Sequence, residues 1–92
     1  MKILGAEWTV VERDLQGINW GTMSVGRQEI CLEATMRPDT KLSTLLHEII
    51  EALNSQLELK LAHRTISQLE AGLFSVLNDN GVNLKPLLRG SK

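Results

Sequence analysis

The chain has 92 residues, of which 42% are hydrophobic and 23% are charged, and its 10 basic and 11 acidic residues give a formal net charge of -1. This length predicts a single domain, residues 1–92, with one modest core. The near-zero charge and the scattered basic residues argue against a nucleic-acid-binding protein. We also expect no membrane association, because the sequence has no run of about 18 apolar residues.

The N-terminal segment and the cysteine content bear on the compartment. Gly5 and Glu7 interrupt the first apolar run well before the roughly 7 residues that the core of a signal peptide requires. Cys31 is the only cysteine, so no intrachain disulfide can form, which favours a reducing compartment. We therefore expect a cytoplasmic protein in which Cys31, set in an alternating run, is a buried structural thiol.

The first third of the chain has the alternating pattern of β-strands. Residues 3–12, ILGAEWTVVE, mix β-branched and aromatic residues with polar ones and predict strand. Residues 15–20, LQGINW, predict a loop. Residues 21–36 show two short alternating runs around Gly26 and Arg27, which indicate a β-hairpin whose turn uses the glycine for a positive φ.

Both tryptophans, Trp8 and Trp20, lie in this part of the chain. Large aromatic side chains contribute most when their rings are buried. We therefore favour hydrophobic anchors of the small sheet over a platform for substrate as the role of both.

A first helical pattern follows the strands. Pro38 separates the two regions, because the residue before a proline is disfavoured in the helical conformation, and Asp39 or Thr40 is the expected cap of the helix. From Leu42 onward the apolar residues recur every three to four positions, which predicts an amphipathic helix. Its stripe consists of Leu42, Leu45, Leu46, Ile49 and Leu53.

A second helix is predicted from about His63 to the sequence NDNG. There Asn80 or Gly81 takes the left-handed conformation that commonly ends a helix. The apolar stripe of this helix is expected to face the core and consists of Ile66, Leu69, Leu73 and Leu77. Residues 82–92 predict a partly packed arm that frays at its end.

Strand and helix patterns are segregated along the chain, which predicts an α+β fold. We expect a small antiparallel sheet from about the first 36 residues, packed against two helices of roughly 14 to 18 residues each. This arrangement places both histidines of the chain on the helical layer.

The string HEIIE has the spacing of a chelating pair. His47 and Glu51 are four residues apart, so their side chains rise from neighbouring turns of a helix and can bind one ion. Glu48 points roughly 100° away from His47, which suits it to act on a water rather than to join the pair. Zinc needs at least three protein ligands, and His63 is the candidate for the third. This requires the start of the second helix to lie beside the middle of the first.

The segment from Thr44 to Gly81 resembles the core of small zincin-like proteins of bacteriophages and prophages, in which an HExxH helix precedes a helix ending in a VLxDN-type motif. In that family the first helix supplies two histidines and the second supplies an acidic ligand near its start. Here Glu51 stands at the second histidine, and His63 stands about where the acidic ligand would be. The resemblance implies a minimal zincin-like fold and a zinc-dependent peptidase, with His47, Glu51 and His63 binding Zn²⁺ and Glu48 activating water.

Other interpretations stay open at this level. Glu70 lies two turns after His63 on the same face and is a partner of a ligand, an alternative ligand or a surface residue. An enzyme of this kind has a peptide or protein as its partner, held along a free edge of the sheet. The alternatives are a non-catalytic metal-binding or protein-interaction module with the same fold, and a purely structural domain with HEIIE facing solvent.

Overall fold

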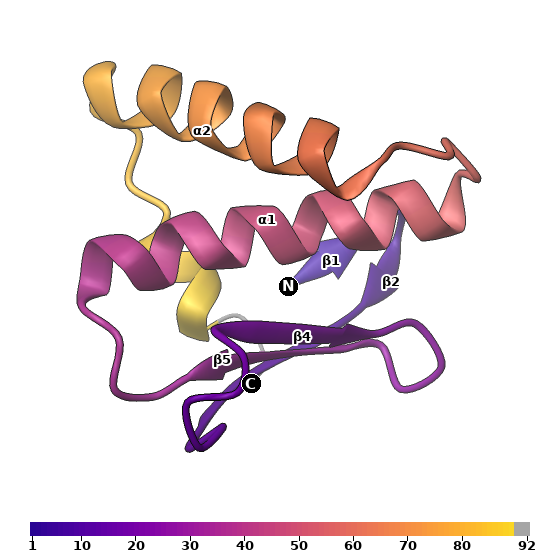
Figure 1. Ribbon diagram of the computed structural model, residues 1–92, viewed down its shortest axis with the longest axis horizontal. Helices are drawn as coiled ribbons and strands as arrows, with labels where there is room; N and C mark the ends of the chain where they lie inside the picture. The colour runs from indigo at the N-terminus through magenta and orange to yellow at the C-terminus, as the bar shows by residue number, and fades with distance from the viewer. Residues whose placement is uncertain (90–92) are drawn as a thin grey trace.

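The computed structural model describes residues 1–89 and has two helices stacked over small sheets (Figure 1). In Figure 1, α2 lies on one side of α1 and the strands lie on the other, so α1 is the middle layer. The predicted α+β fold is confirmed. In chain order the elements are β1 (Lys2–Ile3), β2 (Ala6–Glu7), β3 (Thr9–Arg13), β4 (Gly21–Ser24), β5 (Glu29–Glu33), α1 (Pro38–Gln56), α2 (His63–Asp79) and the 3-10 helix η1 (Lys85–Arg89).

The strand predicted over residues 3–12 is divided into three pieces. β1 and β2 form a short antiparallel hairpin, joined by Leu4 and Gly5 with φ angles of 50° and 82°. Two successive positive φ values suit a two-residue hairpin loop, because the loop then follows the twist of the strands. The chain continues as β3, which carries the buried Val10, while the preceding Trp8 is fully buried as predicted.

A three-stranded sheet with the order β3-β5-β4 underlies α1. β4 and β5 form the predicted antiparallel hairpin, but β3 runs parallel to β5, so the sheet is mixed rather than purely antiparallel. β5 is the central strand, and Ile30 and Leu32 are fully buried. Cys31 is buried too, as predicted, which shows that both faces of this strand are covered.

The hairpin turn differs from the prediction in its backbone. The residue with a positive φ, 49°, is Gln28 and not Gly26. The loop spans residues 25–28 and is closed by a bond from the Gln28 N–H to the Val25 carbonyl, with an N to O distance of 3.2 Å. Four-residue hairpin loops are usually built around a type I turn, whose central residues keep negative φ, so the left-handed residue comes after the glycine.

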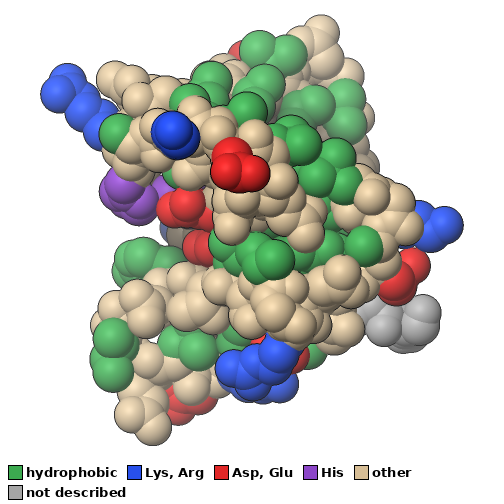
Figure 2. All heavy atoms as spheres, turned by 90° about the vertical axis from the view of Figure 1, so that its right-hand side faces the viewer, with side chains coloured by type: hydrophobic (Ala, Val, Ile, Leu, Met, Phe, Trp, Pro, Cys, Tyr) green, Lys and Arg blue, Asp and Glu red, His purple; other side chains and the backbone are tan. Residues whose placement is uncertain are grey.

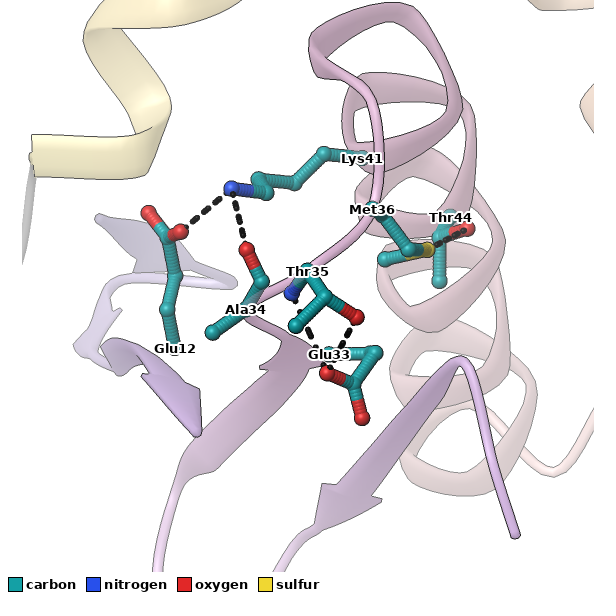
Figure 3. A network of polar contacts seen from close by, with 7 residues as sticks. All are labelled: Glu12, Glu33, Ala34, Thr35, Met36, Lys41 and Thr44. Atoms are coloured by element: carbon teal, nitrogen blue, oxygen red, sulfur yellow. Dashed lines mark hydrogen bonds and ion pairs between the residues drawn. The ribbon is translucent and has the colours of Figure 1, made fainter. Parts of the chain in front are cut away.

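Glu33 at the end of β5 organises the segments that leave the sheet (Figure 3). Its carboxylate accepts bonds from the Leu15 N–H at 2.7 Å and from the N–H and hydroxyl of Thr35 at 3.1 and 2.9 Å. These three bonds hold the pKa of Glu33 below its ordinary value. Close by, the Lys41 ammonium of α1 contacts Glu12 at 2.5 Å and the Ala34 carbonyl at 3.3 Å (Figure 3).

α1 begins earlier than the predicted caps. Arg37 is the N-cap residue and forms no side-chain capping bond, while Pro38 occupies the first turn. Neither Asp39 nor Thr40 is therefore the cap. Proline suits this position because the first N–H groups of a helix have no partner within it, and Asp39 adds a negative charge near the positive end of the helix dipole.

α2 ends as predicted but packs differently. Asn80 is its C-cap and Gly81 has a φ of 72°. Ile66 is fully buried, but Leu69 and Leu73 are 42% and 44% exposed, so the prediction that the whole stripe faces the core is wrong. The helix packs mainly on α1 through a narrow face, and the leucines lie to one side of that face.

The arm after α2 is packed as predicted. η1 contacts β3, and Leu87 and Leu88 pack against the core cluster. The expected fraying concerns residues 90–92, which lie outside the described part of the chain. Within residues 1–89, neither helix combines the length and the apolar character needed to cross a membrane.

We expect Glu33→Gln to destabilise the fold in a pH-dependent manner. An amide keeps the size of the side chain but cannot accept from all three donors as a carboxylate does. Because folding lowers the pKa of Glu33, its stabilising effect is full above the ordinary value of 4.5 and is lost as the pH falls through the lowered value. Urea unfolding at pH 7 and at pH 3 should show a difference between wild type and variant that shrinks in acid. The exposed Glu58→Gln is the control, and a difference independent of pH would contradict this account.

Candidate metal centre

α1 presents His47 and Glu51 toward α2, one helical turn apart. The His47 Nε2 atom lies 3.4 Å from the Glu51 Oε2 atom. Both side chains are largely buried, which limits the directions they can take. The helix periodicity therefore brings together the two residues whose spacing predicts a chelating pair.

His63 reaches the same place from the first residue of α2. The connection is folded back on α1 by Asn54, whose amide donates to the Leu61 carbonyl at 3.3 Å and accepts from the Leu61 N–H at 2.8 Å. The His63 Nδ1 atom lies 3.6 Å from Glu51 Oε2, and the His47 and His63 rings are 5.1 Å apart between centroids. The start of α2 thus lies beside the middle of α1, as a shared site requires.

The three predicted ligands form one group. Their ligand atoms all lie within 4.8 Å of one another. Around a tetrahedral zinc ion, ligand atoms about 2.0 to 2.2 Å from the metal are roughly 3.3 to 3.5 Å apart. A shift of about 1 Å closes this gap, and His63, whose side chain is 76% exposed, has the freedom to make it. Two imidazoles and one carboxylate are donors that zinc accepts, with one position left open.

Glu70 of α2 holds the other nitrogen of His47. Its Oε1 atom lies 2.8 Å from His47 Nδ1, and its Oε2 atom accepts a bond from the Ser43 hydroxyl at 2.5 Å. Because a carboxylate only accepts, the contact with Glu70 requires a proton on His47 Nδ1, and Nε2, on the side of Glu51 and His63, is then the atom that could bind a metal. Of the three roles left open by the sequence, this contact favours that of a partner of a candidate ligand.

Glu48 lies on the side of α1 that faces the sheet. It is 8% exposed, and within residues 1–89 its carboxylate forms no hydrogen bond or ion pair. Burial raises the pKa of Glu48, the carboxylates of Glu51 and Glu70 raise it further, and the two imidazoles oppose them. A carboxylate of raised pKa with free oxygens is a better proton acceptor than an exposed one.

The first residue of β4 controls the position of Glu48. A Cβ atom on Gly21 would lie 2.8 Å from Thr44 Cγ2 and 3.1 Å from the Glu48 Oε2 atom. Only a glycine therefore lets β4 approach α1 this closely without moving one of them. The sequence alone does not indicate this residue, because no local pattern predicts a contact across 27 positions of the chain.

These side chains surround a cavity of about 400 Å³. Trp20 belongs to its lining and is 65% exposed, so the prediction that it anchors the core is wrong, whereas the prediction holds for Trp8. Figure 2 shows the histidines beside acidic side chains at an indentation in the outline of the molecule. The lining consists of Trp20, Gly21, Thr44, His47, Glu48, Glu51, His63, Ser67 and Glu70.

Comparisons with known proteins give no independent assignment. No protein-family model matches the chain, and no curated protein or solved structure is significantly similar to it. What the site does is therefore inferred from its own geometry.

We expect Glu70→Ala to weaken zinc binding about 10- to 100-fold, because His47 loses the group that fixes its orientation and tautomer. Ser43→Ala should have a smaller effect in the same direction, since it removes only the bond that holds Glu70. Competition with a chromogenic chelator measures both affinities. Glu58→Gln, an exposed change of similar charge, is the control, and equal affinities for Glu70→Ala and this control would remove Glu70 from the site.

Proposed function

We propose that the protein is a minimal zinc-dependent hydrolase of the peptidase type. The observation that carries the proposal is the convergence of His47, Glu51 and His63 at the cavity that also contains the buried Glu48. The charge of the cavity supports a bound cation. Its lining has three carboxylates and neither lysine nor arginine, so a divalent ion would relieve their repulsion.

Different residues would bind the metal and transfer the proton. A zinc ion held by His47, Glu51 and His63 would supply Lewis acidity, which lowers the pKa of water and polarises a carbonyl group. Glu48 would take the proton of a water in the cavity and return it to the leaving amine. Its burial keeps its carboxylate away from bulk water, and its raised pKa favours both transfers.

The free edge of the sheet offers a place for a peptide. Among residues 1–89, β4 pairs only with β5, and its first residue, Gly21, lies against Glu48. An extended peptide that adds to this edge as a further strand would pass the cavity mouth. Trp20, exposed beside it, would give apolar contact to a substrate side chain.

The resemblance to zincin-like phage and prophage proteins is part of the proposal. Glu51 stands where that family has its second histidine and His63 about where it has the acidic ligand, and this exchange would preserve a ligand set of two histidines and one carboxylate. We also place the protein in the cytoplasm, because its single cysteine, Cys31, is buried and unpaired.

A second candidate function is a non-catalytic metal-binding or protein-interaction module. It is favoured by the lack of arginine, lysine and tyrosine in the lining, since these groups commonly stabilise a developing oxyanion. The hydroxyls of Thr44 and Ser67 and the Trp20 indole are the donors available there. Zinc binding without turnover would favour this module over the hydrolase.

Two matched substitutions on α1 should separate binding from catalysis. Glu51→Gln should weaken metal retention, because the neutral amide is a poorer ligand than the carboxylate. Glu48→Gln should leave the metal in place and reduce hydrolysis about 100- to 10,000-fold, because it removes the base. Metal content is measured by mass spectrometry on protein purified without a histidine tag, and turnover on a peptide library.

The outcomes assign each residue separately. Equal metal content in wild type and Glu51→Gln would exclude Glu51 as a ligand. Turnover that survives in Glu48→Gln would exclude Glu48 as the base. Wild-type protein that binds zinc and cleaves nothing would replace the hydrolase with the binding module.

Zinc should also stabilise the fold, because it would connect α1 to α2. At a free zinc concentration one hundred times the dissociation constant, the expected gain is about 2.7 kcal/mol, or roughly 10 to 20 °C in melting temperature. His63→Ala should remove most of this gain while leaving the metal-free melting temperature unchanged, since His63 is exposed. Gln68→Ala on the same helix is the control, and a zinc-induced rise that persists in His63→Ala would place the metal elsewhere.

A further inference from the structure

Trp20 belongs to the lining of two cavities, the candidate metal centre and a second one of about 280 Å³. The second cavity is lined by Trp20, by the loop before it and by residues at the end of β5. Pockets for whole small molecules are roughly 300 to 1,000 Å³, so this volume suits a single side chain. We call it the side cavity. The 65% exposed Trp20 ring is thus a wall shared with the candidate metal centre.

Glu33 holds the loop of residues 14–20 at both of its ends. Its carboxylate accepts the bond from the Leu15 N–H at 2.7 Å, and its own N–H donates to the Trp20 carbonyl at 2.8 Å. Within the loop, the Ile18 N–H donates to the Leu15 carbonyl at 3.2 Å. The backbone around the side cavity is therefore fixed to β5, and the cavity is a formed part of the fold.

The ionisable side chains of the side cavity are acidic. Asp14 and Glu33 line it, and no lysine, arginine or histidine among residues 1–89 does. Glu33 is only 4% exposed, and in the same part of the chain neither carboxylate forms an ion pair. Buried charges are usually paired with an opposite charge. The three hydrogen bonds to Glu33 orient it but bring no positive charge, so the side cavity favours a cation.

We propose that the side cavity receives a basic side chain, arginine or lysine, of a peptide bound at the candidate metal centre. This inference rests on the proposed peptidase function and names its substrate class, peptides with a basic residue close to the bond that is cleaved. β4 begins at Gly21, directly after Trp20. A peptide that adds to the edge of β4 and passes Glu48 at Gly21 therefore reaches Trp20 next.

A cationic group suits both the wall and the charges of the side cavity. A guanidinium or ammonium over the face of a tryptophan is attracted by the ring, and the carboxylates of Asp14 and Glu33 attract the same charge. The several N–H donors of a guanidinium would also meet the amide oxygens of Gln16 and Asn19 in the lining. An apolar side chain would gain only the contact with Trp20, and an acidic one would be repelled.

Calorimetric titration with matched peptides tests the side cavity without requiring hydrolysis. The probes are acetylated hexapeptide amides that carry arginine, citrulline, norleucine or glutamate at one position, and citrulline has nearly the shape of arginine without its charge. In EDTA and low salt, the arginine peptide should bind about tenfold more tightly than the citrulline peptide. Trp8 is fully buried, so binding at the side cavity should change the emission of Trp20 and lose this signal in Trp20→Phe.

Asp14→Asn is the most specific variant. The amide keeps an oxygen that accepts the Gln16 N–H, at 2.8 Å in the wild type, but removes a charge from the side cavity. It should lower the ratio of arginine to citrulline affinity about threefold, and Trp20→Ala should lower it by a similar factor. Asp79→Asn, an exposed change of the same kind on α2, is the control and should keep the wild-type ratio. Circular dichroism establishes that each variant is folded.

Turnover of a peptide library by the zinc-loaded protein separates this inference from the proposed function. Cleavage close to arginine or lysine supports both. Arginine-selective binding without any cleavage supports the side cavity while excluding the hydrolase. Cleavage that ignores basic residues leaves the hydrolase and overturns the side cavity. Equal affinity for the arginine and citrulline peptides, tighter binding of the norleucine peptide, or a ratio that neither Asp14→Asn nor Trp20→Ala changes would overturn it as well.

Discussion

The close approach of α1 to the first residue of β4 determines the layout of the candidate site. A side chain larger than hydrogen at Gly21 would press on Thr44 and on the Glu48 carboxylate, so the two layers meet only because this residue is glycine. The contact buries Glu48 between the helix and the sheet, and burial raises its pKa. Because a helix turns about 100° per residue, the neighbouring His47 then points toward α2. One packing contact thus fixes the position of Glu48, the proposed base, relative to the proposed ligands.

The part of this site that lies on one helix could be predicted from the sequence. The spacing of His47 and Glu51 fixes their side chains on neighbouring turns whatever surrounds the helix. The place of His63 follows from a short connection that reverses the chain, and Asn54 holds that connection by two bonds. Gly21 was not predictable in this way, because its contact with α1 depends on the register of β4 against β5 and no local pattern records that register.

The differences between the predicted and the observed fold have a common cause. Periodicity shows that an element has an apolar face, but it does not show how many partners cover that face. The pattern of β5 predicts one half of a hairpin, yet its buried run from Ile30 to Leu32 is that of a central strand, and β3 pairs with its second edge in parallel. The opposite holds for α2, where Leu69 and Leu73 fit a core pattern and remain exposed in the single chain. In both cases the local pattern identifies the apolar residues but does not give the number of elements that pack on them.

The charge of the cavity relates the buried carboxylate to the proposed metal. Glu48, Glu51 and Glu70 share one cavity with two imidazoles and no lysine or arginine, so three ionised carboxylates would repel one another there. Glu70 contacts His47 and Ser43, and Glu51 lies near both imidazoles. Within residues 1–89 Glu48 forms no hydrogen bond or ion pair. The negative charges of Glu51 and Glu70 therefore add to burial in raising its pKa. A divalent cation between the imidazoles would reduce the repulsion among these three carboxylates, the same repulsion that contributes to the raised pKa of Glu48.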